Sequence, residues 1–369
     1  MRERFLPSGR VHYFPMHDYL GEGRFKSLLS GKECTVEIAK KTVDGTLYNT
    51  SVPSTHKRKF DVADNVACIA PNGLPKHAAG HTHYVLLGAG KTAMDAGVWL
   101  IDNGADPNAI TWVCPRDSWL MNRATTQPGP EFFESTIGGQ AAQFEALAAA
   151  TNTEDLFLRL EAAGYFLRID QDVMPSMFHF ATISTGEVAQ LQKINTVVRG
   201  HRTARIDDGR MTMQNGDEID VPKGVLYIDC TATAVEFSKD NQPVFDGDMI
   251  TLQPLRAPLV TLSAAIAAYV EAHYESDEEK NNLCTPVLLC DTPEAWLHTV
   301  MGNMQNQYKW SQEKPLRNWI AECRLDGFSK MVAQTDMSDP KKADIVKRLK
   351  EGGMPAAMNV QKLLSEITG

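Results

Sequence analysis

The fold is decided by residues 84–95, which read Tyr84-Val-Leu-Leu-Gly-Ala-Gly-Lys-Thr-Ala-Met-Asp95. The four apolar residues at 84–87 are typical of a short parallel strand that is covered on both faces. Two glycines end this run, and residues 91–103 then show an apolar helical period that stops at Asn103-Gly104. A second strand is predicted at 109–113. The sequence therefore predicts a right-handed β-α-β unit of an α/β fold.

The turn between the first strand and the helix has the pattern G-x-G-x-x-A. Gly88 allows a tight turn, Gly90 lets backbone N–H groups approach two phosphates, and Ala93 keeps the helix close to the sheet. The first helical turn adds unpaired N–H groups and a positive dipole end. We therefore predict that NADP(H) or NAD(H) binds here. The predicted cofactor-binding residues of the turn are Gly88, Ala89, Gly90, Lys91, Thr92 and Ala93, with the Thr92 hydroxyl as a further donor.

The choice between the two nucleotides is read after the second strand, where the sequence is Cys114-Pro-Arg-Asp117. An arginine there pairs with the 2′-phosphate of NADP, whereas a carboxylate accepts from the ribose 2′-OH of NAD. Arg116 favours NADP(H), and Asp117 keeps NAD(H) open. Arg123 is a further cofactor-binding residue that we expect nearby. The alternative for Arg116 is a solvated surface arginine.

The glycine turn has two other possible interpretations, a P-loop and a turn without any ligand. Gly90-Lys-Thr92 resembles the end of a P-loop, but that motif needs a glycine five positions before Gly90, where Val85 stands. A glycine turn without any ligand is the other alternative. The order of strand, motif, helix and second strand favours dinucleotide binding over both.

Composition sets the broad class. The length of 369 residues suggests two domains, and 43% hydrophobic with 22% charged residues is ordinary for a globular protein. A net charge of −9 argues against a general nucleic-acid binder, and no segment reaches the roughly 20 apolar residues needed to span a bilayer. We expect a cytoplasmic location, a small-molecule substrate, and neither a nucleic-acid nor a membrane partner. The seven cysteines form no C-x-x-C pair and no zinc pattern, so no metal is expected.

Patterns elsewhere predict the other elements. Before residue 80 we expect short strands at 10–13, 34–39, 46–52 and 65–70. Helices are expected at 131–150, 154–163, 262–273, 293–301 and 315–323. Residues 196–198, 203–206 and 210–213 resemble a small antiparallel meander, and 224–229 a buried strand. The Lys-rich end of the chain is expected to be mobile.

Three segments together resemble a known family. They are Tyr84–Asp95, then Ile110-Thr-Trp-Val-Cys-Pro-Arg-Asp-Ser-Trp119, and Asp229-Cys-Thr-Ala232. They are similar to bacterial FAD- and NAD(P)-dependent oxidoreductases with two dinucleotide-binding domains, with flavin-containing monooxygenases as looser kin. The likeness runs from the first residues to about Ala272. Gly73-Leu-Pro-Lys-His77 also resembles the G-x-x-x-H part of the monooxygenase fingerprint, although Pro71 replaces its aromatic residue; a surface or linker histidine is the alternative for His77.

The resemblance implies a Rossmann-like NAD(P)-binding domain that is inserted in a partial FAD-binding domain. The implied ranges are 1–81 for the first part of the FAD-type domain, 82–235 for the NAD(P) domain, 236–290 for the returning FAD part and 291–369 for a helical C-terminal region. Ser263-Ala-Ala265 resembles the returning FAD segment, and an Ala-rich core helix is its alternative. The implied activity is hydride transfer from NADPH to FAD, with a possible monooxygenase half-reaction.

One departure from the family concerns the flavin. The family's first G-x-G-x-x-G, which holds the FAD pyrophosphate, should precede the NAD(P) motif, and this sequence has none. Either the sequence is a truncated product or the protein has lost the usual FAD-binding motif. FAD binding is therefore implied by the resemblance alone. The alternative function is a non-catalytic NADP(H)-binding protein, or a remnant of such an enzyme. The sequence predicts neither the catalytic residues nor the oligomeric state.

Overall fold

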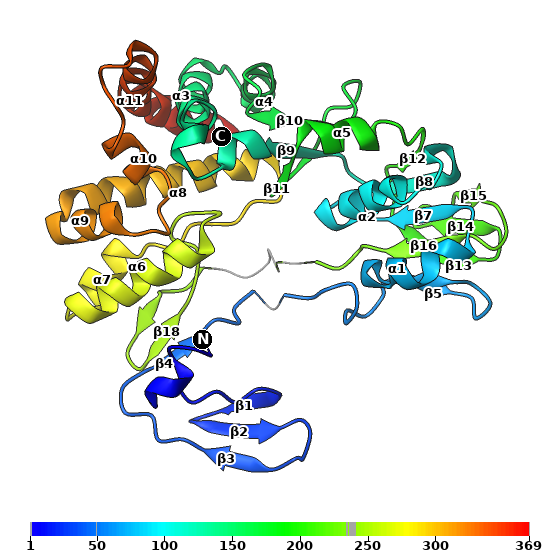
Figure 1. Ribbon diagram of the computed structural model, residues 1–369, viewed down its shortest axis with the longest axis horizontal. Helices are drawn as coiled ribbons and strands as arrows, with labels where there is room; N and C mark the ends of the chain where they lie inside the picture. Colours follow the sequence, from blue (N-terminus) through cyan, green and yellow to red (C-terminus); the bar gives the residue numbers. More distant parts are fainter. Residues whose placement is uncertain (1, 49, 234, 236–240, 369) are drawn as a thin grey trace.

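A five-stranded parallel sheet carries the predicted β-α-β unit (Figure 1). The structure is a computed structural model that describes residues 2–48, 50–233, 235 and 241–368. The strands of this sheet are β6 (Cys68–Ile69), β7 (Tyr84–Leu87), β8 (Ile110–Cys114), β12 (Thr196–Arg199) and β16 (Leu226–Asp229). They lie in the order β12-β8-β7-β16-β6, and all neighbours are parallel. The chain adds β8 and β12 on one side of β7 and β16 on the other, so its direction of winding reverses between β7 and β16.

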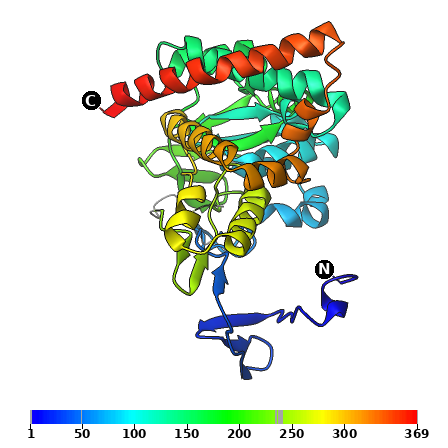
Figure 2. The ribbon, with the colours of Figure 1, turned by 90° about the vertical axis from the view of Figure 1, so that its left-hand side faces the viewer.

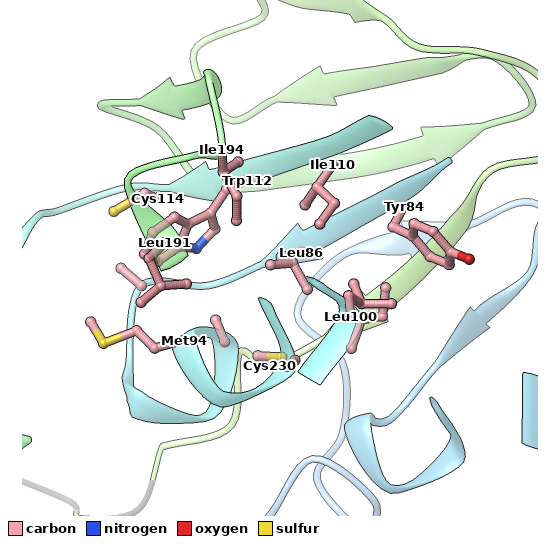
Figure 3. Packing of buried hydrophobic residues seen from close by; sticks show 14 of the residues in the cluster. Tyr84, Leu86, Met94, Leu100, Ile110, Trp112, Cys114, Leu191, Ile194 and Cys230 are labelled. Carbon is pink, nitrogen blue, oxygen red and sulfur yellow. The ribbon is translucent and has the colours of Figure 1, made fainter. Parts of the chain in front are cut away.

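Helices α2 (Lys91–Asp102) and α5 (Thr185–Leu191) cover one face of this sheet. Figure 3 shows Leu86 and Ile110 of the strands facing Leu100 of α2, with Leu191 and Ile194 beside Trp112. Gly97 brings α2 close to this layer, because an added Cβ would lie 3.0 Å from Leu191 and 3.2 Å from Leu86. The helix is thus held against the strands by small residues on its inner side.

A second, smaller sheet covers the other face of the parallel sheet. Its strands are β5 (Asp61–Val62), β13 (Thr203–Asp207), β14 (Arg210–Met213) and β15 (Glu218–Asp220), in the order β15-β14-β13-β5. Val85, Leu87 and Tyr227 of the parallel sheet pack against Ile206 and Met211 of the small sheet. Both faces of β7 are therefore buried, as its unbroken apolar run predicts.

An aromatic core joins the next segment to the C-terminal helices. The strands are β9 (Ser118–Asn122), β10 (Phe166–Leu167) and β11 (Met177–Ile183), and the helices are α3 (Phe133–Ala149), α4 (Thr153–Ala162), α8 (Pro293–Gln312) and α11 (Pro340–Thr368). Trp119, Phe157, Phe166 and Trp296 pack in one cluster with ring centroids 5.2 to 5.4 Å apart. This cluster is the centre of the second part of the molecule, at the upper left of Figure 1.

A third core lies under helix α6 (Val260–His273), which packs with Val244, Phe245 and Ile250. The other elements of this region are β4 (Thr42–Asp44), β17 (Phe245–Asp246), β18 (Met249–Thr251), α7 (Asp277–Leu283), α9 (Lys314–Glu322) and α10 (Ser329–Ala333). Strand β4 pairs in parallel with β18, which ties the N-terminal part of the chain to this region.

The first strands stand apart from these cores. β1 (His17–Gly21), β2 (Arg24–Ser27) and β3 (Glu33–Thr35) form an antiparallel sheet that projects below the rest of the molecule in Figure 2. Short helical turns complete the chain. They are η1 (Leu6–Ser8), η2 (Pro71–Gly73), α1 (Leu74–His77), η3 (Ala78–Gly80), η4 (Pro107–Ala109), η5 (Arg123–Thr126) and η6 (Pro130–Phe132).

The predicted α/β fold class is confirmed, with its parallel sheet and helical C-terminal region. Four local predictions are wrong. Residues 196–199 do not join a meander but form the edge strand of the parallel sheet, paired with β8. No strand forms at 10–13 or in the described residues of 46–52; the neighbouring residues 17–21 and 42–44 form β1 and β4 instead.

The fourth wrong prediction is that the end of the chain is mobile, because these residues form the 29-residue helix α11. Its apolar side chains Ala356, Val360 and Leu363 are buried in the aromatic core, and Asn359 donates to two carbonyl groups at the end of α3 over 2.8 Å. Within the described residues, no helix combines the length and the apolar character needed to cross a membrane.

Candidate nucleotide-binding site

The glycine turn lies at the carboxyl edge of the parallel sheet, where the winding reverses between β7 and β16. Ligands of open α/β sheets bind at such a point. Gly88 has φ +120°, and an added Cβ would stand 2.8 Å from the carbonyl oxygen of Cys230 at the end of β16. A glycine is therefore required at 88 by the fold itself.

Gly90 has a different reason to be glycine. Its φ of −84° is open to any residue, and an added Cβ would meet no atom within 4 Å. The protein therefore leaves free space in front of this residue, and the fold alone does not explain the missing side chain. A ligand that approaches the backbone here would explain it.

The N-terminus of α2 faces the same space and has no side-chain cap among the described residues. Ala93 and Met94 donate to the Gly90 carbonyl, over 3.0 and 3.2 Å, and Gly88 N–H donates to the Val113 carbonyl over 2.9 Å. The N–H groups of residues 89–92 have no acceptor among the described residues. Trp112 donates its indole N–H to the Gly88 carbonyl over 2.7 Å, which holds the turn against β8. A bare helix start beside a fixed glycine turn fits the pyrophosphate of a dinucleotide.

The two residues expected to choose the nucleotide differ in their contacts. Asp117 accepts from Arg199 at both oxygens, over 2.9 and 3.3 Å, and Arg199 also donates to Asp170 over 2.8 Å. Arg116 follows β8 half-buried, and no ion pair joins it to any described residue. The Asp117 carboxylate is thus neutralised by the protein, whereas the Arg116 guanidinium has no carboxylate partner among the described residues.

Lys91 and Arg123 meet through a residue that the sequence analysis missed, Glu187 of α5. Lys91 Nζ lies 3.2 Å from one Glu187 oxygen, and Arg123 Nη2 lies 3.0 Å from the other; Lys91 also pairs with Asp95. Glu187 closes a capping box with Ser184, so Ser184-Thr-Gly-Glu187 is a signal that could have located it. The structure thus brings Arg123 to the mouth of the turn, while Thr92 is exposed and Ala93 is fully buried against the sheet.

The Glu187 carboxylate is held ionised. Burial by itself raises its pKa, but hydrogen bonds from Ser184 and Arg123 and the charge of Lys91 outweigh this and lower the pKa to about 2. A carboxyl whose pKa is depressed on folding stabilises the protein above its unfolded value of 4.5, and this contribution is lost as the pH falls toward 2.

We therefore expect the Glu187→Gln variant to lower the free energy of unfolding at pH 7 by about 1 to 2 kcal/mol, after allowing for the solvent screening of these partly exposed pairs. The difference from the wild type should shrink steadily between pH 4.5 and pH 2. Urea unfolding across this range measures it. Glu322→Gln, which removes an exposed carboxylate on α9, should change the free energy by less than about 0.5 kcal/mol. A Glu187→Gln effect that stays constant down to pH 2 would contradict the assignment.

A small cavity of about 10 Å³ adjoins the turn on the side of β8. Ala89, Trp112 and Asp117 line it on one side, and the segment 168–175 closes it on the other. A space of this size holds one water molecule at most. An adenosine group placed in this cavity would therefore require segment 168–175 to move.

On the face of the sheet away from α2, the end of β16 carries a buried ion pair. Asp229, whose side chain is 1% exposed, accepts from His56 Nε2 over 2.8 Å and from the backbone N–H and hydroxyl of Thr231 over 3.0 and 2.7 Å. Arg58 Nε lies 3.5 Å from the same carboxylate. These contacts fix residues 229–231 beside Gly88, and no sequence pattern marks the distant partners His56 and Arg58.

The thiols near the turn are not reactive groups. Burial, with a smaller contribution from the Asp117 charge, raises the pKa of Cys114 to about 12, and burial and Asp229 raise that of Cys230 as well. All seven cysteines are free thiols. In the part of the chain that the structure describes, no group of three metal-ligating side chains comes together.

Comparison with known proteins gives relatives by sequence. No protein-family model matches the chain. Uncharacterized proteins of Mycobacterium tuberculosis (strains H37Rv and CDC 1551) and Mycobacterium bovis are 43% identical to it over 326 residues. The match covers 88% of this chain but 60% of each relative, so the chain spans about three fifths of the length of these relatives.

Solved structures with a partial likeness are Tmm from Pelagibacter sp. strain HTCC7211, the sulfide:quinone oxidoreductase of Aquifex aeolicus, and FAD-bound DfoA of Erwinia amylovora, a cadaverine monooxygenase. Their sequence identities to this chain are 10%, 10% and 12%, and their TM-scores are 0.36, 0.31 and 0.28. The alignments cover 91%, 86% and 78% of this chain, and 61%, 62% and 64% of those chains. None of these three TM-scores reaches 0.5.

Proposed function

We propose that this chain binds NADP(H) through the bare N-terminus of α2 and forms the nicotinamide-binding part of a flavin-dependent oxidoreductase. The observation that carries the proposal is Gly90, whose missing side chain faces empty space at the switch point of the sheet. The backbone N–H groups of the turn would hold the pyrophosphate, and Gly88 would keep the turn close to β16. When bound, the nicotinamide supplies a hydride.

Arg116 supports NADP(H) over NAD(H). Its guanidinium has no ion pair with a described residue, whereas both oxygens of Asp117 are engaged by Arg199. A planar fork binds a phosphate at two points, and a carboxylate already paired with an arginine is a poor acceptor for a ribose hydroxyl. Lys91 and Arg123 at the mouth of the turn are paired with Glu187, and Lys91 also with Asp95, so this group adds no net charge.

We therefore expect the Arg116→Ala variant to weaken NADPH binding by about 10- to 100-fold, which corresponds to the loss of one charge-assisted bidentate contact. NADH affinity should stay within about twofold, because NADH has no 2′-phosphate. Calorimetric titration with both nucleotides measures the ratio, and Arg24→Ala on β2 is the control. Equal weakening for the two nucleotides would remove Arg116 from the 2′-phosphate.

The residues of this chain do not provide a comparable binding turn for FAD. The sequence has no second G-x-G-x-x-G or G-x-G-x-x-A motif, so it contains no recognisable motif that would bind the FAD pyrophosphate. We derive no step through the flavin on this chain. Where FAD takes part, as the family resemblance implies, other polypeptide would have to supply its binding turn.

A second candidate, from a different class, is a non-catalytic NADP(H)-binding protein, and the missing flavin turn favours it. The two are separated by the absorbance spectrum of the purified chain and by NADPH oxidation with added FAD. A flavin spectrum with NADPH consumption supports the oxidoreductase. NADPH binding without either leaves the binding protein, and the absence of NADPH binding refutes both.

A further inference from the structure

The small N-terminal sheet has one apolar and one charged face. Tyr19 of β1 is paired with Phe25 of β2, which is paired with Cys34 of β3, and Phe14 stacks on Phe25 with ring centroids 5.2 Å apart. The adjacent positions Asp18, Lys26 and Glu33 are paired across the strands in the same way and point to the opposite side. We call Phe14, Tyr19, Phe25 and Cys34 the aromatic face.

The described part of the chain covers the aromatic face only in part, since Phe25 and Cys34 are half-buried while Tyr19 and Phe14 are exposed. Tyr19 is 46% and Phe14 is 37% exposed, and no hydrophobic side chain before Leu74 is buried among the described residues. Twelve exposed large hydrophobic side chains lie between Phe5 and Val52, and eleven are spread over the remaining described residues. A three-stranded sheet with a partly uncovered apolar face lacks the burial that stabilises such sheets, so it needs a partner.

The length of the relatives indicates what this partner is. The mycobacterial proteins match this chain over only 60% of their own length, so each contains a large segment outside the matched residues. We propose that the aromatic face is the docking surface for a polypeptide equivalent to that segment. The interface goes beyond the proposed nucleotide binding and does not depend on it, because the aromatic face lies on a different sheet from the glycine turn (Figure 1).

Charge at the sheet is balanced, so the apolar side chains define the surface that the partner must match. Residues 14–35 contain three Lys and Arg against three Asp and Glu, and Asp18, Lys26 and Glu33 lie on the opposite side from the aromatic face. The partner surface that contacts Tyr19 and Phe14 is therefore apolar.

The test is co-expression of the full chain, carrying an affinity tag, with the segment of the Mycobacterium tuberculosis relative that lies outside the 326 matched residues. We expect the two to co-purify as a 1:1 complex without added nucleotide, and amide hydrogen exchange to slow in β1, β2 and β3. Tyr19→Asp should reduce complex formation at least about tenfold. Asp18→Asn, on the same strand but the opposite face, is the matched control and should leave it unchanged.

Several results would overturn the proposal. One is a soluble mycobacterial segment that does not co-purify, and another is a segment that stays insoluble in the presence of this chain. Sedimentation of the chain alone should give the monomer mass of 40.8 kDa. A dimer that Tyr19→Asp dissociates would show that a second copy is the occupant, and Tyr19-dependent binding to phosphatidylglycerol vesicles would show a membrane.

Discussion

The Gly90→Asp variant is expected to lose NADPH binding by at least about 100-fold while it remains folded. The new side chain would project into the space in front of α2, where it meets no protein atom within 4 Å, and φ is −84°. Its bulk would keep the phosphates from the backbone N–H groups, and its charge would repel them. Titration calorimetry with NADPH and thermal unfolding of the same samples measure the two effects.

Gly80→Asp is the matched control for this variant. An added Cβ at Gly80 also meets no atom within 4 Å, and this residue lies before β7, at the opposite edge of the sheet from the turn. The same charge is therefore introduced at a comparable open position. NADPH affinity should be unchanged in Gly80→Asp, and both variants should unfold within about 0.5 kcal/mol of the wild type. Retained affinity in Gly90→Asp would exclude the turn as the binding site.

The sequence predicts the turn well because its determinants are local. A wholly apolar strand, two glycines and an amphipathic helix follow one another within residues 84–103, and each restricts the backbone at its own position. The bounds of β7 agree with the prediction, and those of α2 agree to within one residue. Gly88 shows the limit of such reasoning, since the atom that forbids a side chain there belongs to Cys230.

Partners that are distant in sequence could not be predicted in this way. Glu187 meets Lys91 only because α5 packs beside α2, and His56 meets Asp229 only because the chain returns to the sheet after 173 residues. The prediction that 196–198 belong to a meander is wrong because a strand of four residues does not reveal which strand it pairs with. The Lys residues at the start of α11 favoured the prediction of a mobile end, although Ala356 and Val360 further along the helix are buried.

The contacts at the switch point connect stability to the candidate site. Cys230 holds the carbonyl oxygen that approaches Gly88, and it lies between Asp229 and Thr231, which are joined by two hydrogen bonds. The position of the glycine turn therefore depends on how firmly residues 229–231 are held. His56 and Arg58 reach this point from the segment before β6, so they act as supports for the turn.

The Asp229→Ala variant is expected to lower the free energy of unfolding by about 3 to 4 kcal/mol. The change leaves His56 Nε2 and the two donor groups of Thr231 without their buried acceptor. Asp229→Asn should cost less, because its amide oxygen can still accept from Thr231 and its amide nitrogen can donate to a neutral His56. Chemical denaturation of both variants measures this order.

A double-mutant cycle measures the interaction between His56 and Asp229 separately from the loss of side-chain volume. If His56 and Asp229 act as a pair, the losses in free energy of unfolding caused by Asp229→Ala and His56→Ala should not be additive. The loss in the double variant should be smaller than the sum of the two single losses by more than about 1 kcal/mol. NADPH affinity should fall in parallel in Asp229→Ala, since the Cys230 carbonyl would no longer be held against Gly88. Additive losses, or an Asp229→Ala cost below about 1 kcal/mol, would mean that the carboxylate does not support the turn.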